Sequence, residues 1–160
     1  MIISDPNSPE FNSYASFEDL RAFAKLRLYE LPDDEEEQSA LLIQAMDYLE
    51  SMKWKGKRKD VNQPLAWPRV YVVVDGVPID PSSIPKKLIA AQCRLAIEAQ
   101  EVDLTPTLGG EVISERVEGA VSVTYAEGTN SGAPEFSWLS GLLDGLMATG
   151  SGGIVNVMRG

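Results

Sequence analysis

Apolar residues recur at three- and four-residue steps in four stretches of the chain, the spacing of a helix that buries one face. This pattern predicts helices over residues 16–29, 33–53, 84–99 and 136–147. Ser16 and Ser83 are candidate N-caps of the first and third helices. The apolar face of the third helix is rich in alanine, which lets other helices approach closely, so we expect this helix to lie centrally.

Other segments show the features of strands. Val70 to Val74 are β-branched or aromatic and lead into Asp75-Gly76, a pair that favours a tight hairpin turn. Further along, the β-prone runs 112–117 and 120–125 predict a half-exposed β-hairpin inserted at about 111–126.

The predicted fold class is therefore mainly α, a small helical bundle of about four helices with a β-hairpin and an extended C-terminal tail. We expect a helical domain over residues 1–148, then a glycine-rich linker and apolar tail over 149–160. No apolar run approaches the ~20 residues that span a bilayer, and the N-terminal segment lacks the basic region of a secretory signal. We expect no membrane association and synthesis in the cytosol.

The residues available for catalysis are few. The sequence contains no histidine and one cysteine, Cys93, so it lacks an imidazole base, a histidine metal ligand and an intrachain disulfide. No pair of carboxylates, lysines or tyrosines stands out by its spacing. We expect a protein that is not an enzyme, has no cofactor and no metal, and buries an inert thiol at Cys93.

The net charge of −10 disfavours tight, sequence-independent binding of nucleic acid. Five consecutive acids open the second predicted helix: Asp33, Asp34, Glu35, Glu36 and Glu37. We interpret them as a solvated first turn that compensates the helix dipole, and the alternative is a cation-binding or DNA-repelling edge.

A basic loop, residues 53–59 with the sequence KWKGKRK, follows that helix. Its cations are Lys53, Lys55, Lys57, Arg58 and Lys59. Two interpretations stay open: a helix C-terminus with cations that suit the dipole, or a patch that contacts phosphates or a partner's carboxylates.

Beyond the basic loop, Pro64 and Pro68 hold the backbone extended on either side of Trp67. This arrangement favours insertion of the indole into a groove. We expect that groove to lie in the chain's own core more readily than on a neighbour.

The last residues join a glycine-rich linker to an apolar, β-prone end. A frayed tail is one interpretation. Because frayed tails are seldom so apolar, we favour a strand that orders by adding to the sheet of another subunit.

Several motifs in this order resemble a known bacteriophage family: LIQAMDYL at 42–49, WKGKR at 54–58, QPLAWPR at 63–69, then Asp75-Gly76 and Ile84-Pro85 before a helix. Over about residues 12–159 the chain is similar to the head–tail connector, or adaptor, proteins of tailed phages. That family also carries the label "putative DnaT-like single-stranded-DNA-binding protein". The pairing of WKGKR with QPLAWPR is the most specific part of the likeness.

The resemblance implies a structural virion protein of the phage neck that forms a homo-oligomeric ring, a dodecamer. The ring would dock on the portal protein, extend the channel for genomic DNA without sequence-specific binding, and carry the next neck or tail protein. Residues 33–37 would line the channel with carboxylates, and Trp54, Trp67, Pro68 and Arg69 would anchor the fold or subunit contacts. Carried over by position, the portal-docking tail would comprise Ile154, Val155, Val157, Met158 and Arg159.

The alternative is a replication accessory protein that binds single-stranded DNA through the basic loop and Trp54. Charge and base stacking would supply its affinity.

Overall fold

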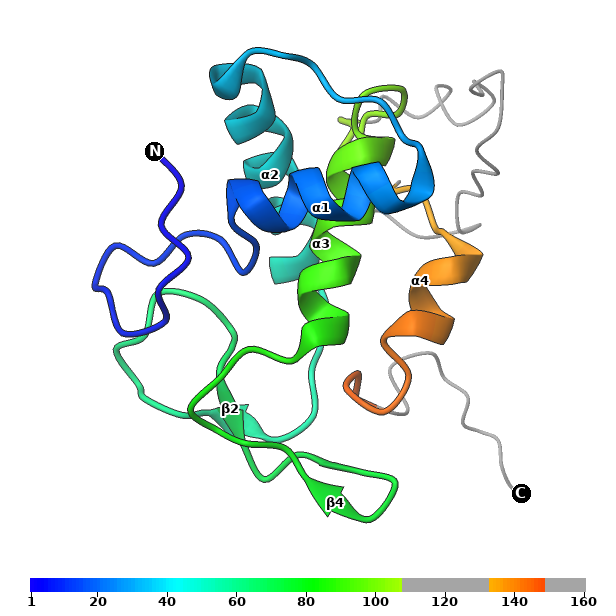
Figure 1. Cartoon of the computed structure of the whole chain (residues 1–160). Helices are drawn as coiled ribbons and strands as arrows, with labels where there is room; N and C mark the ends of the chain where they lie inside the picture. Colours follow the sequence, from blue (N-terminus) through cyan, green and yellow to red (C-terminus); the bar gives the residue numbers. More distant parts are fainter. Residues whose placement is uncertain (108–132, 149–160) are drawn as a thin grey trace.

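The computed structural model describes residues 1–107 and 133–148 (Figure 1). Within these residues the fold is mainly helical, as the sequence predicts, with two small antiparallel sheets. The helices are α1 (Phe17–Arg27), α2 (Glu35–Glu50), α3 (Lys86–Glu98) and α4 (Ser137–Leu142). Because α3 packs against each of the other three, its predicted central position is confirmed.

The start of α1 follows the sequence closely. The Ser16 hydroxyl accepts a hydrogen bond from the Asp19 amide, and the Asp19 carboxylate accepts one from the Ser16 amide, both at 3.0 Å. This reciprocal capping box satisfies two amides that a helix start would otherwise leave unpaired. The helix ends before Leu28, whose φ of +59° turns the chain away two residues earlier than predicted.

Three further predictions at helix ends were wrong for reasons that the structure shows. The second helix ends at Glu50 and not near Lys53, because the chain turns at Ser51 and carries Trp54 into the core. Pro85, not Ser83, occupies the N-cap position of α3, where no side chain caps the helix. The last helix ends at Leu142, because the chain turns back through Gly145, at φ +91°, towards the basic loop.

A buried amide ties the N-terminal arm to the helices. The side-chain oxygen of Gln92 on α3 accepts a hydrogen bond from the Ala15 amide at 2.8 Å. Its nitrogen donates to the Ser13 hydroxyl at 2.8 Å and to the Leu42 carbonyl at 3.1 Å. Gln92 is fully buried, and these three bonds satisfy it.

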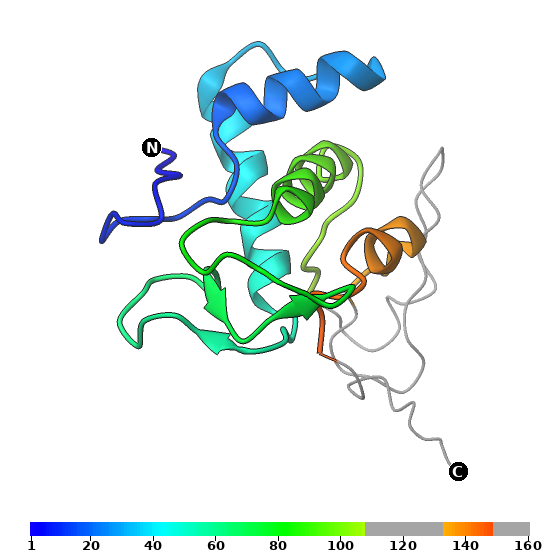
Figure 2. The same cartoon turned by 60° about the horizontal axis from the view of Figure 1, so that its bottom comes forward.

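Both sheets lie at one end of the helical bundle (Figure 2). One pairs β1 (Lys57–Arg58) with β2 (Arg69–Val70), and the other pairs β3 (Val73–Val74) with β4 (Val77–Pro78). The predicted turn at Asp75-Gly76 is confirmed, since both residues have positive φ, 54° and 77°, as a type I′ turn requires.

The predicted hairpin at 111–126 and the tail at 149–160 lie outside the described residues. In the part that is described, no helix is both long enough and apolar enough to cross a bilayer.

Candidate functional site

The basic loop, residues 53–59, is fastened to the turn that follows α4. The Lys55 amide donates to the Leu146 carbonyl at 2.9 Å, and the Ala148 amide donates to the Lys53 carbonyl at 3.0 Å. These backbone bonds join segments about 90 residues apart in sequence. The loop is therefore held in a defined conformation and is not simply the frayed end of α2.

The two tryptophans next to the loop are buried. Trp67 is fully enclosed in the chain's own core and Trp54 is 7% exposed; their rings meet edge to face with centroids 5.7 Å apart. Pro68 is buried beside them. The Trp54 ring has almost no free surface, so it cannot stack on a base. The single-stranded-DNA hypothesis was therefore wrong in assigning base stacking to Trp54.

Gly56 allows the loop to approach β2 closely. Its φ is +69°, and a Cβ at this position would lie 2.1 Å from the Val70 carbonyl oxygen. Only glycine fits such a contact. The approach sets the pairing of β1 with β2, in which Lys57 lies opposite Val70 and Arg58 opposite Arg69.

Arg69 stabilises the loop from within. Its Nε donates to the Lys55 carbonyl at 2.6 Å, its Nη2 to the Gly56 carbonyl at 3.0 Å and its Nη1 to the Ala66 carbonyl at 3.0 Å. Burial, and then the neighbouring Arg58, lower the pKa of Arg69. A guanidinium with so many donors in use positions the backbone and has little left for a ligand.

Arg58 is tied down in a similar way. Its Nη1 donates to the Leu65 carbonyl at 2.8 Å and to the Gln63 carbonyl at 3.2 Å. The side chain remains exposed, so its charge still contributes to the surface although one guanidinium nitrogen already donates to these carbonyls.

The four lysines of the loop are different. Lys53, Lys57 and Lys59 are exposed and Lys55 is half-buried. Within residues 1–107 and 133–148, none of them forms an ion pair with a carboxylate. Lys57, Arg58 and Lys59 line one open depression together with Val61 and Arg69. Lys55 lines a separate depression that Asp75 and Asp144 also line. The loop thus presents four ammonium groups on a fixed frame, two of them at one depression.

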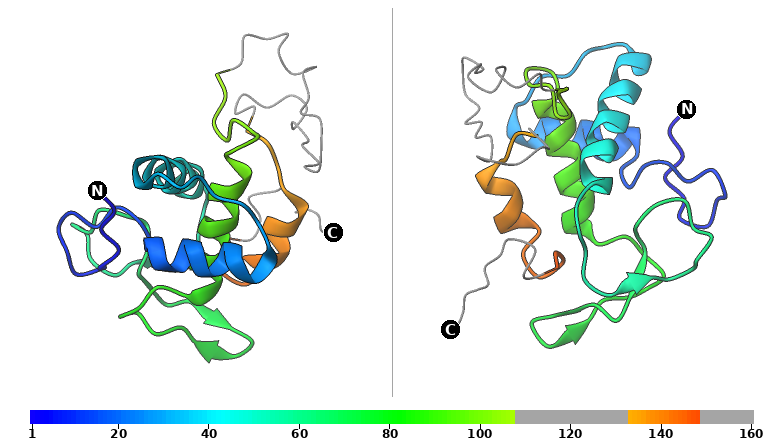
Figure 3. Two further views of the ribbon diagram at one scale, coloured as in Figure 1. Left: turned by 45° about the horizontal axis from the view of Figure 1, so that its top comes forward. Right: turned by 180° about the vertical axis from the view of Figure 1, so that it is seen from behind.

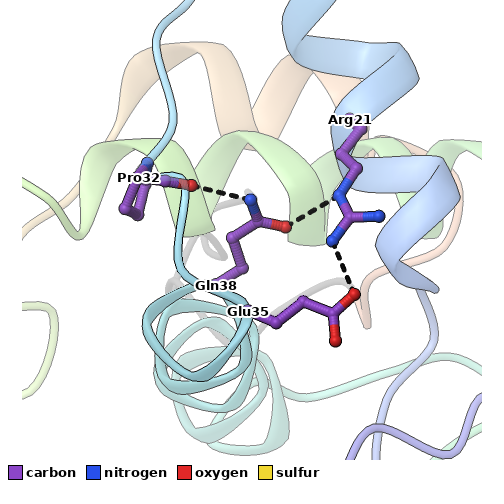
Figure 4. Close-up of polar contacts among 4 residues, drawn as sticks. All are labelled: Arg21, Pro32, Glu35 and Gln38. Carbon is purple, nitrogen blue, oxygen red and sulfur yellow. Dashed lines mark hydrogen bonds and ion pairs between the residues drawn. The ribbon is translucent and has the colours of Figure 1, made fainter.

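The acidic segment, residues 33–37, is exposed at the opposite end of α2. Figure 4 shows how its junction with α1 is held: Arg21 Nη2 pairs with Glu35 Oε2 at 2.9 Å, and Arg21 Nε donates to Gln38 Oε1 at 3.0 Å. Gln38 in turn donates to the Pro32 carbonyl at 2.7 Å. Asp34 occupies the N-cap position without a side-chain cap, so this carboxylate faces water.

The helix α2 keeps the acidic segment and the basic loop apart (Figures 1 and 3). Its 16 residues span ~24 Å at 1.5 Å per residue. At physiological ionic strength the Debye length is about 8 Å, so charges at the two ends hardly influence each other. The net charge of −10 is therefore unevenly distributed, with five carboxylates in residues 33–37 before α2 and at its start, and five cations in residues 53–59 after its end.

The family model described as "Putative DnaT-like ssDNA binding protein" matches residues 1–160. The chain belongs to this DnaT-like family. Among curated proteins and among solved structures, nothing matched. The family description refers to single-stranded DNA and names no head–tail connector, so the connector role implied by the resemblance stays a proposal.

Tyr71 belongs to the site of this DnaT-like protein, although no motif in the sequence points to it. Its side chain is 79% exposed next to the basic loop, and its φ is +65°. The sequence could have indicated this exposure through VYVVV at 70–74. Side chains alternate along a strand, which puts Tyr71 and Val73 on the face opposite Val72. The backbone conformation that exposes the ring has no signature in the sequence.

The remaining chemistry of the DnaT-like chain is limited. Burial raises the pKa of the Cys93 thiol to about 12, so little thiolate forms near neutral pH. In the part of the chain that the structure describes, no group of three His, Cys, Asp or Glu residues could hold a metal ion. The predicted tail residues 154–159 lie outside that part.

Proposed function

We propose that this protein binds single-stranded DNA through the lysines of the basic loop and acts by binding, without catalysis. One observation carries the proposal: four lysines without an ion pair, in the described residues, stand on a backbone fastened by hydrogen bonds. Membership of a family described as single-stranded-DNA-binding supports the same ligand.

The physical basis is phosphate neutralisation. Each lysine that pairs with a phosphate releases condensed counterions, which makes binding favourable and dependent on salt. Four such contacts predict a slope of log affinity against log salt concentration of about −3 for a single strand. Arg69 keeps the lysines in place by binding the loop backbone at Lys55, and Arg58 ties the loop to the Leu65 carbonyl.

The acidic segment does not cancel this attraction, because α2 places it several Debye lengths away from the loop. Asp60 borders the loop and subtracts one charge. Asp75 and Asp144 line a depression together with Lys55 and Lys87. Hydrogen bonds from Ser82, and then the charge of Lys59, lower the pKa of Asp80. The local balance over residues 53–60 is still positive, with five cations against one carboxylate.

The test compares two double variants with equal charge change. Lys57→Gln with Lys59→Gln removes two exposed charges from the loop, and Lys25→Gln with Arg27→Gln removes two from the last turn of α1. Fluorescence anisotropy with a labelled oligothymidylate of about 16 nucleotides measures affinity at low salt. We expect the loop variant to lose affinity about tenfold and the α1 variant to stay near wild type. Equal affinities for both variants, or no binding by wild type, would reject the proposal.

A second function, a ring-forming head–tail adaptor of the phage neck, is supported by a different observation. Exposed apolar side chains accompany both charged ends: Leu26 and Leu28 lie on the stretch that leads to the acidic segment, and Val73 and Val77 lie in the hairpin near the basic loop. A contact between the basic end of one copy and the acidic end of the next is heterologous, and such contacts form a ring when the rotation between copies closes. In this proposal the ring docks on the portal protein, carries the next neck or tail protein and surrounds genomic DNA.

Self-association separates the two functions. Sedimentation velocity at low salt should show oligomers for wild type and monomers for Glu36→Lys with Glu37→Lys. Mixing that variant with a Lys57→Glu, Lys59→Glu variant should restore oligomers, since the intact ends of the two variants attract each other and their reversed ends also carry opposite charges. Deleting residues 154–160 should leave the fold intact and abolish portal binding; portal binding by the truncated chain would remove the tail from the proposal.

A further inference from the structure

Tyr71 adopts a backbone conformation that L-amino acids rarely take, and it presents its ring to solvent. Its φ of +65° lies in the left-handed region, and its side chain is 79% exposed. The residues on both sides fix this conformation: Arg69–Val70 pair with β1, Val73–Val74 pair with β4, and Val72 is 1% exposed. Burial of the ring does not offset the strain, and such strain concentrates at functional sites.

The ring belongs to the surface of the basic loop. Lys57 Nζ lies 5.5 Å from the centroid of the Tyr71 ring, and Lys57 pairs with Val70 in the β1–β2 register. An aromatic face beside a cluster of ammonium groups is the arrangement by which proteins hold single strands, with bases on the ring and phosphates on the cations.

The other aromatic side chains in residues 1–107 and 133–148 are less exposed than Tyr71. Trp54 and Trp67 are buried against each other. Arg94 lies over the Trp138 ring at 4.4 Å, and Tyr29 stacks with Phe23 at 6.4 Å. Among the described aromatic residues, only Tyr71 exposes more than half of its side chain.

We propose that Tyr71 stacks on a base of bound single-stranded DNA while the lysines of the basic loop contact the adjacent phosphates. This inference rests on the proposed function, and it explains why the protein would bind single strands more tightly than duplex DNA. Bases in a duplex are already stacked on each other, whereas those of a single strand offer a free face. Because every base has such a face, the contact tolerates any sequence.

The decisive variant is Tyr71→Gly. Glycine adopts φ +65° without strain, so the substitution removes the ring and leaves the backbone at least as favourable as before. Tyr71→Asn, which also tolerates the left-handed region, is a second ring-free variant. Tyr71→Trp keeps an aromatic face and serves as the matched control. Melting curves establish that all three remain folded.

Anisotropy is measured with a single-stranded oligothymidylate and with a duplex of equal length, over a range of salt concentrations. We expect Tyr71→Gly and Tyr71→Asn to weaken single-strand binding by roughly 5- to 150-fold, with duplex affinity and salt slope unchanged, and Tyr71→Trp to bind like wild type. A neutral side chain should not alter the slope, whereas loss of loop lysines should.

Three results would overturn the inference. If Tyr71→Gly binds single strands as well as wild type, the loop binds DNA but Tyr71 does not stack, and the proposed function survives. If Tyr71→Gly lowers the affinities for single strands and for duplex equally, the Tyr71 ring maintains the conformation of the loop and does not stack on an unpaired base. If wild type fails to bind single strands at low salt, the proposed function and this inference fail together.

Discussion

The hydroxyl of Tyr14 donates a hydrogen bond to Oε2 of Glu50, the last residue of α2, at 2.7 Å. The Glu50 carboxylate also accepts the Ala66 amide at 3.1 Å, and the Tyr14 oxygen accepts the Trp67 amide at 3.3 Å. The N-terminal arm, the end of α2 and the segment before β2 are thereby joined. Burial, and then Glu50, raise the pKa of the Tyr14 phenol far above its ordinary value, so it remains a donor.

Replacing Tyr14 by phenylalanine should destabilise the fold by about 1–3 kcal/mol, because Glu50 loses a donor and the Trp67 amide loses its acceptor in a buried site. Urea denaturation measures the loss. Tyr29→Phe is the matched control, since that hydroxyl lies on an exposed residue. Equal stabilities of the two variants would show that the Tyr14–Glu50 bond does not contribute to stability.

Gly56→Ala should destabilise by more than about 1 kcal/mol, because the backbone is left-handed and the new methyl group would meet the Val70 carbonyl. Gly141→Ala should instead stabilise by about 0.5–1 kcal/mol, since this glycine lies in α4 with open space around it. Thermal melting of both variants provides the comparison. A Gly56→Ala protein as stable as wild type would mean that the loop does not approach β2 so closely.

The helices follow from local rules, which is why the sequence predicts them. Apolar spacing places α1, α2 and α3, and Ser16 and Asp75-Gly76 mark a cap and a turn by chemistry that operates over a few residues. The end of α2 depends instead on contacts with distant residues. Lys53 and Lys55 bond to residues 146–148, and no local pattern encodes that pairing.

The site was predicted only in part for the same reason. The run of cations is visible in the sequence, but the sequence does not show which of these side chains can bind a ligand. Arg69, for example, donates its hydrogen bonds to three carbonyls that the fold brings together. Trp54 looks like a stacking residue when it is read beside four lysines. In the structure the Trp54 ring is buried in the core, and the exposed ring beside the loop is that of Tyr71.

Stability should fall as the pH rises from about 10 to 12. Burial, and then Glu135, raise the pKa of Tyr48 from its ordinary value of 10 to about 12. In that interval the unfolded chain releases a proton that the folded protein keeps, so unfolding becomes more favourable; below pH 10 the contribution is fully present. Urea denaturation at pH 9 to 11 should show a smaller loss for Tyr48→Phe than for wild type, by on the order of 1 kcal/mol at the upper end. Parallel pH profiles for both proteins would contradict the assignment.

The salt dependence of oligothymidylate binding tests the central claim most directly, because it counts the lysines that meet phosphates. Wild type should show a slope of log affinity against log salt of about −3, and Lys57→Gln with Lys59→Gln should reduce it to about −1.4. The Lys25→Gln and Arg27→Gln control should keep the wild-type slope. A loop variant with the wild-type slope, or a wild type without measurable binding at low salt, would contradict the account.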